Sequence, residues 1–140
     1  MSFTQISLLL MALAGCLASI RGPKTLNIAN TVYDLAMADD GSIIVATHSS
    51  SKDAEVFVKT NEGFVFSQNL TGSIGAQRVA ISTNNSIFLN LNTAVIMHYG
   101  RGGDGNYQVL SSIPSTGTGI TDVEICANEE FLACSTSTHL

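Results

Sequence analysis

The sequence predicts an all-β protein built from antiparallel repeats of about 44 residues. Residues 35–44 read LAMADDGSII, and the same pattern of an apolar segment, a polar turn and a second apolar segment returns at 79–88 and 123–132. The intervals are equal, 79 − 35 = 44 and 123 − 79 = 44. A fixed period of this length is typical of a repeat architecture, and short apolar or alternating segments between turn residues indicate strands.

The first repeat predicts four short strands. Apolar and polar residues alternate from Tyr33 to Met37, and Asp39, Asp40 and Gly41 then form a turn. The next segment has no polar face, as expected for a strand that is covered on both sides. A polar loop follows at 47–53 and a turn at 61–63. The expected strands are 32–37, 43–46, 55–59 and 64–66.

The second repeat predicts the same order of strands, and the third begins it again before the sequence ends at Leu140. The turns of the second repeat are 83–85 and the glycine cluster 100–105. The repeats divide the chain into 32–75, 76–119 and the partial unit 120–140. The expected strands are 76–82, 86–90, 94–99, 107–110, 120–126 and 131–135.

Residues 1–18 resemble a signal peptide. The apolar run 6–20 is shorter than the ~20 residues of a membrane-spanning helix, and Cys16, Leu17 and Ala18 suit cleavage before Ser19. No basic residue precedes Arg21, which departs from the usual pattern. We expect an apolar N-terminal helix, a linker at 19–31 and a secreted or extracytoplasmic protein.

Two alternatives to ordinary secretion remain open. Residues 13–16, LAGC, resemble the lipobox of bacterial lipoproteins, in which Cys16 would be the site of lipid attachment and would anchor the protein to a membrane. Otherwise residues 1–20 are a buried element of the domain, or follow a misplaced start codon, and the protein is then cytoplasmic.

Four strands in each period of about 44 residues resemble a blade of a β-propeller, of the WD40-like or FG-GAP-like kind. The most family-like passage, 54–58 with Gly63, Phe64 and 68–70, resembles the third and fourth strands of an FG-GAP-type blade. The chain lacks Trp, a Gly-His pair, a double-glycine kelch signature and a calcium-loop pattern. The resemblance implies an incomplete propeller of about two and a half blades and, secondly, the binding of partners.

Propellers close with four to eight blades, so two and a half blades do not form a ring. We expect this chain to be a fragment of a larger propeller, although copies that assemble, or an open sheet with exposed edges, are the other possibilities. The net charge of −5 and the pI near 4.9 provide no basic surface for nucleic acid. Contact with a membrane is expected only through an uncleaved or lipidated N-terminal segment.

Several patterns resemble functional motifs, but each has a structural explanation. Residues 100–105, GRGGDG, match G-x-G-x-x-G, yet a strand rather than a helix is expected to follow, which favours a hairpin loop over a dinucleotide site. Residues 60–66 resemble the Asp-box of sialidase-like propellers, with Glu62 in place of Asp and no terminal Trp. In that family the box is structural, so no catalytic residue is predicted.

His48, His98 and His139 are 50 and 41 residues apart, without the short spacing of a metal site, and no metal or cofactor is expected. Asn69 and Asn84 begin glycosylation sequons, a number expected by chance. In the predicted hairpin Cys134 faces Val123, which places it too far from Cys126 for a disulfide and favours two buried thiols.

We therefore expect a non-catalytic interaction or scaffold module with unknown protein partners. The first alternative is part of a secreted, sialidase-like enzyme acting on carbohydrate, and the second is a surface lipoprotein anchored through Cys16. A hydrolase would show turnover of glycosides that disappears when one acidic residue is neutralised. A scaffold would show binding without turnover.

Overall fold

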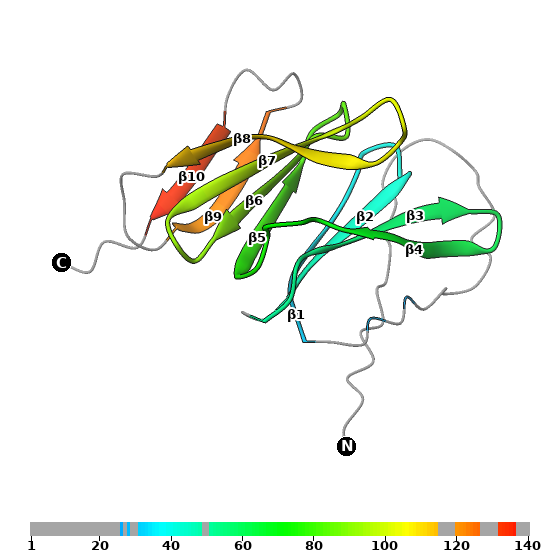
Figure 1. The fold of residues 1–140 in the computed structure, drawn as a ribbon, viewed down its shortest axis with the longest axis horizontal. Coiled ribbons are helices and arrows are strands. Elements are labelled where there is room, and N and C mark those ends of the chain that lie inside the picture. The colour runs from blue at the N-terminus through cyan, green and yellow to red at the C-terminus, as the bar shows by residue number, and fades with distance from the viewer. Residues whose placement is uncertain are drawn as a thin grey trace.

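The computed structural model describes residues 26, 28, 31–48, 51–114, 120–126 and 132–136. Ten strands make up the regular structure of these residues, and no helix occurs among them. The strands form three antiparallel sheets, in each of which hydrogen-bonded neighbours follow one another along the chain (Figure 1). The predicted all-β fold is therefore confirmed at the level of strands and sheets.

Sheets 1 and 2 have four strands each, and sheet 3 has two among the described residues. Each sheet is a meander, so every connection within it is a hairpin. Sheet 1 consists of β1 (Val32–Met37), β2 (Ile43–His48), β3 (Glu55–Thr60) and β4 (Gly63–Asn69). Sheet 2 consists of β5 (Ala76–Ile81), β6 (Ile87–Leu91), β7 (Val95–Arg101) and β8 (Tyr107–Pro114). Sheet 3 consists of β9 (Ile120–Ile125) and β10 (Leu132–Thr136).

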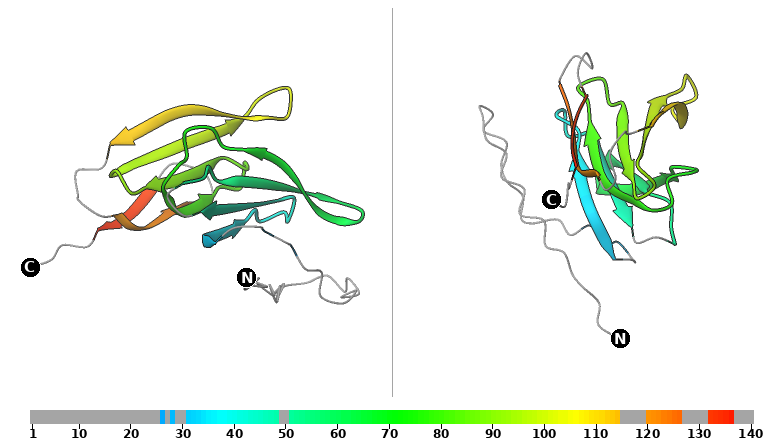
Figure 2. Two further views of the ribbon diagram at one scale, coloured as in Figure 1. Left: turned by 60° about the horizontal axis from the view of Figure 1, so that its bottom comes forward. Right: turned by 90° about the vertical axis from the view of Figure 1, so that its left-hand side faces the viewer.

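The sheets follow one another across the molecule in the order 1, 2, 3, with their first strands in contact (Figures 1 and 2). β5 contacts β1 on one side and β9 on the other. The main apolar cluster lies between sheets 1 and 2 and includes Val45, Val56, Leu89 and Tyr99. A second cluster, with Phe88, joins sheet 2 to sheet 3. Burial between the sheets thus holds the three together.

β2 has no polar face because it is covered on both sides. All six of its residues are buried. Ile43 and Val45 belong to the cluster shared with sheet 2, whereas Ile44 and Ala46 face the other side, where Leu26 and Ile28 pack against them. Because side chains alternate between the faces of a strand, a strand covered on both sides is apolar throughout.

The hairpin turns follow the predicted turn residues. Gly41 has a φ of 67° in the β1–β2 turn, and Asp40 Oδ1 accepts a hydrogen bond of 2.8 Å from the Ser42 amide. In the β7–β8 turn, Asp104 Oδ1 accepts in the same way from the Asn106 amide at 3.0 Å. These bonds favour the turn conformation. The pKa of Asp40 is lowered by hydrogen bonds from the side chain and then the amide of Ser42, and that of Asp104 by hydrogen bonds from the side chain and then the amide of Asn106.

The structure corrects several boundaries of the predicted elements. The expected polar loop at 47–53 begins later, because Thr47 and His48 continue β2 and are buried. Gly100 and Arg101 belong to β7, so the glycine cluster is only partly a turn. β4 and β8 extend beyond their predicted ends, to Asn69 and Pro114.

The two cysteines of the third repeat do not form a disulfide. Cys134 lies opposite Val123, as predicted. However, Cys134 is exposed and Cys126 is half-buried, so the expectation that both thiols are buried was wrong. Cys134 is the central residue of β10, an edge strand with which no further strand pairs among the described residues. The expected helix at 1–18, with Cys16, lies outside the described residues.

Candidate functional site

The first strands of all three sheets contain a β-bulge at the same place. The register shifts between Val32 and Asp34 in β1, between Ala76 and Arg78 in β5, and between Ile120 and Asp122 in β9. The extra residue is 33, 77 or 121, so the bulges repeat at intervals of 44. A bulge redirects the adjacent side chains and is over-represented next to functional sites.

Asp34 is the residue that follows the first bulge, and it ties β1 to β5. Its Oδ1 accepts a hydrogen bond of 2.9 Å from the amide of Leu35. Its Oδ2 accepts one of 3.0 Å from the amide of Val79, in the neighbouring sheet. Both oxygens therefore accept bonds from backbone donors, which are stronger to a carboxylate than to a neutral acceptor.

Arg78 and Asp122 follow the other two bulges. Arg78 Nε donates a 3.0 Å hydrogen bond to the carbonyl of Thr121 in β9, and its Nη1 donates to the carbonyl of Gln77 at 2.9 Å. Asp122 Oδ1 accepts from the amide of Val123 at 3.0 Å, as Asp34 does from its own neighbour. Asp34 of β1 thus accepts from an amide of β5, the first strand of sheet 2. Arg78 of β5 in turn donates to a carbonyl of β9, the first strand of sheet 3.

A cleft of about 410 Å³ crosses the three first strands at these residues. Three acidic side chains and one basic side chain line it, together with apolar residues. The cleft is thus suited to recognising peptide groups and basic groups. The lining residues include no Ser, Cys or His, so carboxylates are the groups in it that have the chemistry of a nucleophile or general base. The lining residues are Asp34, Leu35, Ala36, Met37, Arg78, Val79, Ala80, Ile81, Asp122, Val123 and Glu124.

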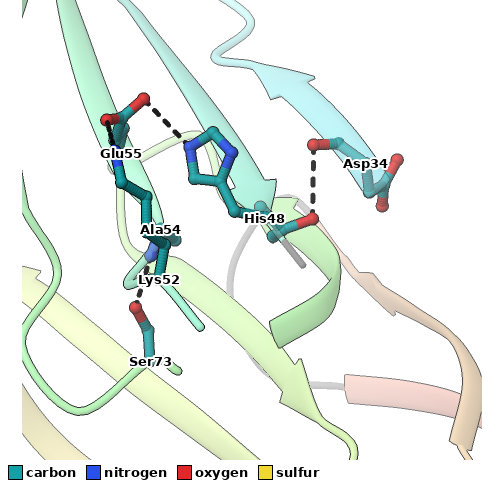
Figure 3. A network of polar contacts seen from close by, with 7 residues as sticks. Asp34, His48, Lys52, Ala54, Glu55 and Ser73 are labelled. Carbon is teal, nitrogen blue, oxygen red and sulfur yellow. Dashed lines mark hydrogen bonds and ion pairs between the residues drawn. The ribbon is translucent and has the colours of Figure 1, made fainter. Parts of the chain in front are cut away.

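A second polar cluster lies at the ends of β2 and β3 (Figure 3). His48 is fully buried, and its Nε2 is 2.9 Å from Glu55 Oε2. The ammonium of Lys52 is 3.6 Å from Glu55 Oε1. The carboxylate of Asp34 points away from the His48 ring, so this cluster is separate from the cleft. It joins two adjacent strands of one sheet, which is a structural role.

The other two histidines of the sequence are not placed in this cluster. His98 lies in β7 of sheet 2, where its ring stacks on Phe88 with a centroid distance of 4.3 Å. Its Nδ1 is 3.4 Å from the hydroxyl oxygen of Ser111. His139 lies outside the described residues. Within the described ranges, no three His, Cys, Asp or Glu side chains are grouped as a metal site.

A side-chain amide fixes the outer strands of sheet 2 against sheet 1. Gln68 Nε2 donates to the Tyr107 carbonyl at 3.1 Å, and Gln68 Oε1 accepts from the Tyr107 amide at 2.8 Å. Nearby, Tyr99 donates to the carbonyl of Thr71 at 3.1 Å. These bonds make the packing between the two sheets specific, because a buried polar group needs its partner.

The remaining predicted motifs lie in hairpins and on the surface. Residues 100–105 include the β7–β8 turn and are followed by β8, which agrees with a hairpin rather than a dinucleotide loop. Residues 60–66 span the β3–β4 hairpin. Asn69 and Asn84 are both exposed, so glycosylation there stays a prediction. Cys16, the possible lipid attachment site, lies outside the described residues.

Comparison with known proteins supports the fold and no more. No family model and no curated protein matches the chain. Among solved structures, the chain is similar to hydrazine synthase from Kuenenia stuttgartiensis, with a TM-score of 0.64 and 10% sequence identity. The match covers 76% of this chain and 29% of that one, so this chain spans less than a third of its structural neighbour. At this identity the likeness concerns architecture alone.

The cleft residues were missed by the sequence analysis, although a signal was present. Asp34, Arg78 and Asp122 each precede the repeated phrase and are 44 residues apart. Their charge alternates between negative and positive. The repeat pattern was defined by apolar residues, so it did not show that these three positions are equivalent. Within the described residues, no helix has the length and apolarity to span a membrane.

Proposed function

We propose that this chain is a segment of a β-propeller and serves as a non-catalytic interaction or scaffold module. The observation that carries the proposal is the bulge that recurs in β1, β5 and β9. In β1 and β5 it is followed by a side chain, Asp34 or Arg78, that bonds the first strand of the next sheet. Four-stranded meanders side by side, with first strands innermost, are the arrangement of propeller blades. Such a frame positions loops and one central cleft rigidly.

The chemistry of the cleft favours binding over catalysis. Both oxygens of Asp34 accept bonds from backbone amides, which opposes a role in proton transfer. Arg78 uses Nε and Nη1 for carbonyl groups of the backbone. These side chains hold the frame together and present charge around the cleft, as in a recognition surface.

We also propose that the N-terminal segment directs the protein out of the cytoplasm and that further blades complete the ring. The intact mass of the protein isolated from its source tests both points. A mass well above 14.7 kDa supports a larger propeller. A mass lower by residues 1–18 supports cleavage of a signal peptide, and the missing blades must then come from a partner or from copies.

Partner capture with matched charge reversals tests the interaction function. The purified protein is immobilised as parent, as Arg78→Glu and as Lys59→Glu, and the captured proteins are compared by mass spectrometry. Lys59 is exposed on β3, away from the cleft, and provides the control for a change of charge. We expect a partner that binds the parent and the Lys59 variant and is lost from the Arg78 variant, followed by direct titration with that purified partner.

Two results would contradict the proposal. One is turnover of a glycoside that disappears when a single acidic residue is neutralised, since a scaffold has no catalytic residue. The other is a partner set that Arg78→Glu leaves unchanged while its melting temperature equals that of the parent. Circular dichroism of all three proteins shows whether loss of binding reflects loss of the fold.

A further inference from the structure

We propose that Leu26 and Ile28 form a displaceable strap, which covers one face of sheet 1 at the place where a further blade of the propeller docks. The inference rests on the proposed function and adds an assembly step to it. Both side chains are half-buried and pack on the far face of sheet 1, the face that points away from sheet 2. Among the described residues, they are the members of this apolar cluster that come from outside the sheet. The fully buried residues beneath them are Ile44, Ala46 and Phe57.

The strand register shows that blades use the equivalent face for packing. Leu35 of β1 pairs with Ala46 of β2 on the far face. Val79 follows Leu35 by 44 residues and pairs with Leu89 of β6, on the face that sheet 2 turns toward sheet 1. In sheet 2 this face is covered by a whole neighbouring sheet, whose Val45 belongs to the same cluster. By the symmetry of the repeat, the far face of sheet 1 is the place of the preceding blade in a ring.

The strap covers its face less completely than a blade does. Leu35 is half-buried beside it, whereas the equivalent Val79 is 7% exposed under the cover of sheet 1. Met37, which follows on the same face of β1, is 37% exposed. Because hydrophobic stabilisation increases with the apolar area removed from water, a blade that covers the whole face stabilises it more than the strap does. A blade that docks there therefore replaces the strap.

The one acidic group near the strap does not oppose docking. Glu55 pairs with Ala46 on the far face of sheet 1, and its side chain is 14% exposed. Its two oxygens already lie 2.9 Å from His48 Nε2 and 3.6 Å from the ammonium of Lys52. A buried carboxylate is tolerated where such partners are in place. A docking blade would cover this group together with its partners.

The strap belongs to the part of the chain that signal-peptide cleavage would leave in place. The expected cleavage precedes Ser19, and the strap lies only a few residues before Val32, where β1 begins. A short connection of this kind gives the strap a high effective concentration at its own sheet. The strap can thus open and close without leaving the neighbourhood of the far face.

The reactivity of a buried thiol measures the opening of the strap. Ala46→Cys places a thiol beneath the strap, and Ala54→Cys places one in the cluster between sheets 1 and 2. Both alanines are 0% exposed, so the two reporters are matched. The reporter proteins are full chains with Ser in place of Cys16, Cys126 and Cys134, and a thiol reagent labels them at increasing urea concentrations. Phe57→Cys replaces the first reporter if Ala46→Cys does not fold.

We expect the thiol at position 46 to react at least about tenfold faster than the thiol at position 54 in dilute urea. Its rate should depend little on urea, because lifting the strap exposes little surface, whereas position 54 is reached by global unfolding. Equal rates with equal urea dependence at the two positions would show that the strap is a fixed part of the core, and would overturn the proposal.

A double substitution in the strap tests whether the strap is the cover. Leu26→Ser with Ile28→Ser should increase the labelling rate at position 46 by about a further tenfold, and by more than it changes the rate at position 54. Leu110→Ser with Ile113→Ser removes the same two residue types from exposed positions of β8 and should leave both rates unchanged. An unchanged rate at position 46 in the strap variant would contradict the proposal.

The protein isolated from its source tests the displacement itself. If a further blade has replaced the strap there, the two serine substitutions no longer change the labelling at position 46. If they still accelerate it, the strap is a permanent cover and the displacement is wrong.

The reporter at position 54 separates this inference from the proposed function. Rapid labelling of that thiol without urea would show that sheets 1 and 2 do not pack as neighbouring blades, and the proposed function then fails. Protection at position 54 without local opening at position 46 overturns the strap alone.

Discussion

Tyr99 is the largest fully buried side chain among the residues that the structure describes, and its hydroxyl group lies at the junction of two sheets. Burial, and secondarily the negative charge of Asp53, raise the pKa of Tyr99 from 10.0 to about 12. The protonated form is thus the one that the folded state favours. The associated stability is complete below pH 10 and is lost as the pH rises toward 12.

We predict that alkaline conditions destabilise the protein through Tyr99. A shift of this size corresponds to about 2–3 kcal/mol of unfolding free energy lost between pH 10 and 12. Tyr99→Phe should be about 1 kcal/mol less stable at pH 7, because the hydrogen bond to Thr71 is lost, and should lose less stability at high pH. Urea unfolding at a series of pH values measures both effects. If the unfolding free energies of the parent and the variant fell equally steeply between pH 10 and 12, the assignment of the alkaline loss to Tyr99 would be contradicted.

Val79 tests the packing between sheets 1 and 2. Its side chain is 7% exposed and belongs to the main apolar cluster. Val79→Asp places an unpaired charge there and should cost several kcal/mol, enough to unfold a protein of marginal stability. Val65→Asp is the matched control, because Val65 lies in β4 and is 44% exposed. Equal melting temperatures of the two variants would contradict the packing of Val79 between sheets 1 and 2.

At the scale of elements, the strands could be predicted because their signals are local. The alternation over β1 and the apolar run of β2 were recognisable, and Asp40 and Gly41 marked the turn between them. The end of β2 was missed because Thr47 and His48 are polar. Their burial depends on Asp34 and Glu55, which accept their hydrogen bonds, and these partners were not evident from the local sequence.

Two hairpin turns provide a matched test of backbone strain. Ala94 has a φ of 60°, which is unfavourable for a residue with a Cβ atom, whereas Gly41 has a φ of 67° in the β1–β2 turn. We expect Ala94→Gly to be neutral or to stabilise by up to about 1 kcal/mol, and Gly41→Ala to destabilise by about 1 kcal/mol. No atom lies within 4 Å of the added methyl group at Gly41, so conformation alone is tested. Thermal unfolding of both variants measures the effect. A lower melting temperature for Ala94→Gly together with an unchanged or higher one for Gly41→Ala would refute the turn geometry.

At the scale of the whole molecule, the outer part of sheet 2 is less covered than the inner part. Leu110 and Ile113 in β8 are 61% and 39% exposed, beyond the reach of the two-stranded sheet 3. The outer strand of sheet 1, β4, also exposes Val65 and Phe66, but at Gln68 it is held against sheet 2 by hydrogen bonds to Tyr107. An apolar edge of this kind favours association.

We predict that the double substitution Leu110→Lys and Ile113→Lys reduces concentration-dependent association of the isolated chain. Its melting temperature should change little, because both side chains are exposed in the monomer, Ile113 less so than Leu110. Light scattering as a function of concentration measures the association. Lys substitutions at Ser67 and Asn69 of β4, both exposed, are the control for added charge. Equal association of the parent and the β8 variant would show that this edge is not responsible.

The sequence by itself determined the all-β class, the repeat of 44 residues and the places of the strands and turns. These depend on period-two alternation and on turn residues, which act over a few neighbouring positions. Only the tertiary structure showed that Asp34, Arg78 and Asp122 line one cleft, and that Asp34 bonds an amide 45 residues further along the chain. The reason is physical: a hydrogen bond between sheets depends on how the sheets pack and on where bulges turn the side chains, and neither is encoded in any single segment.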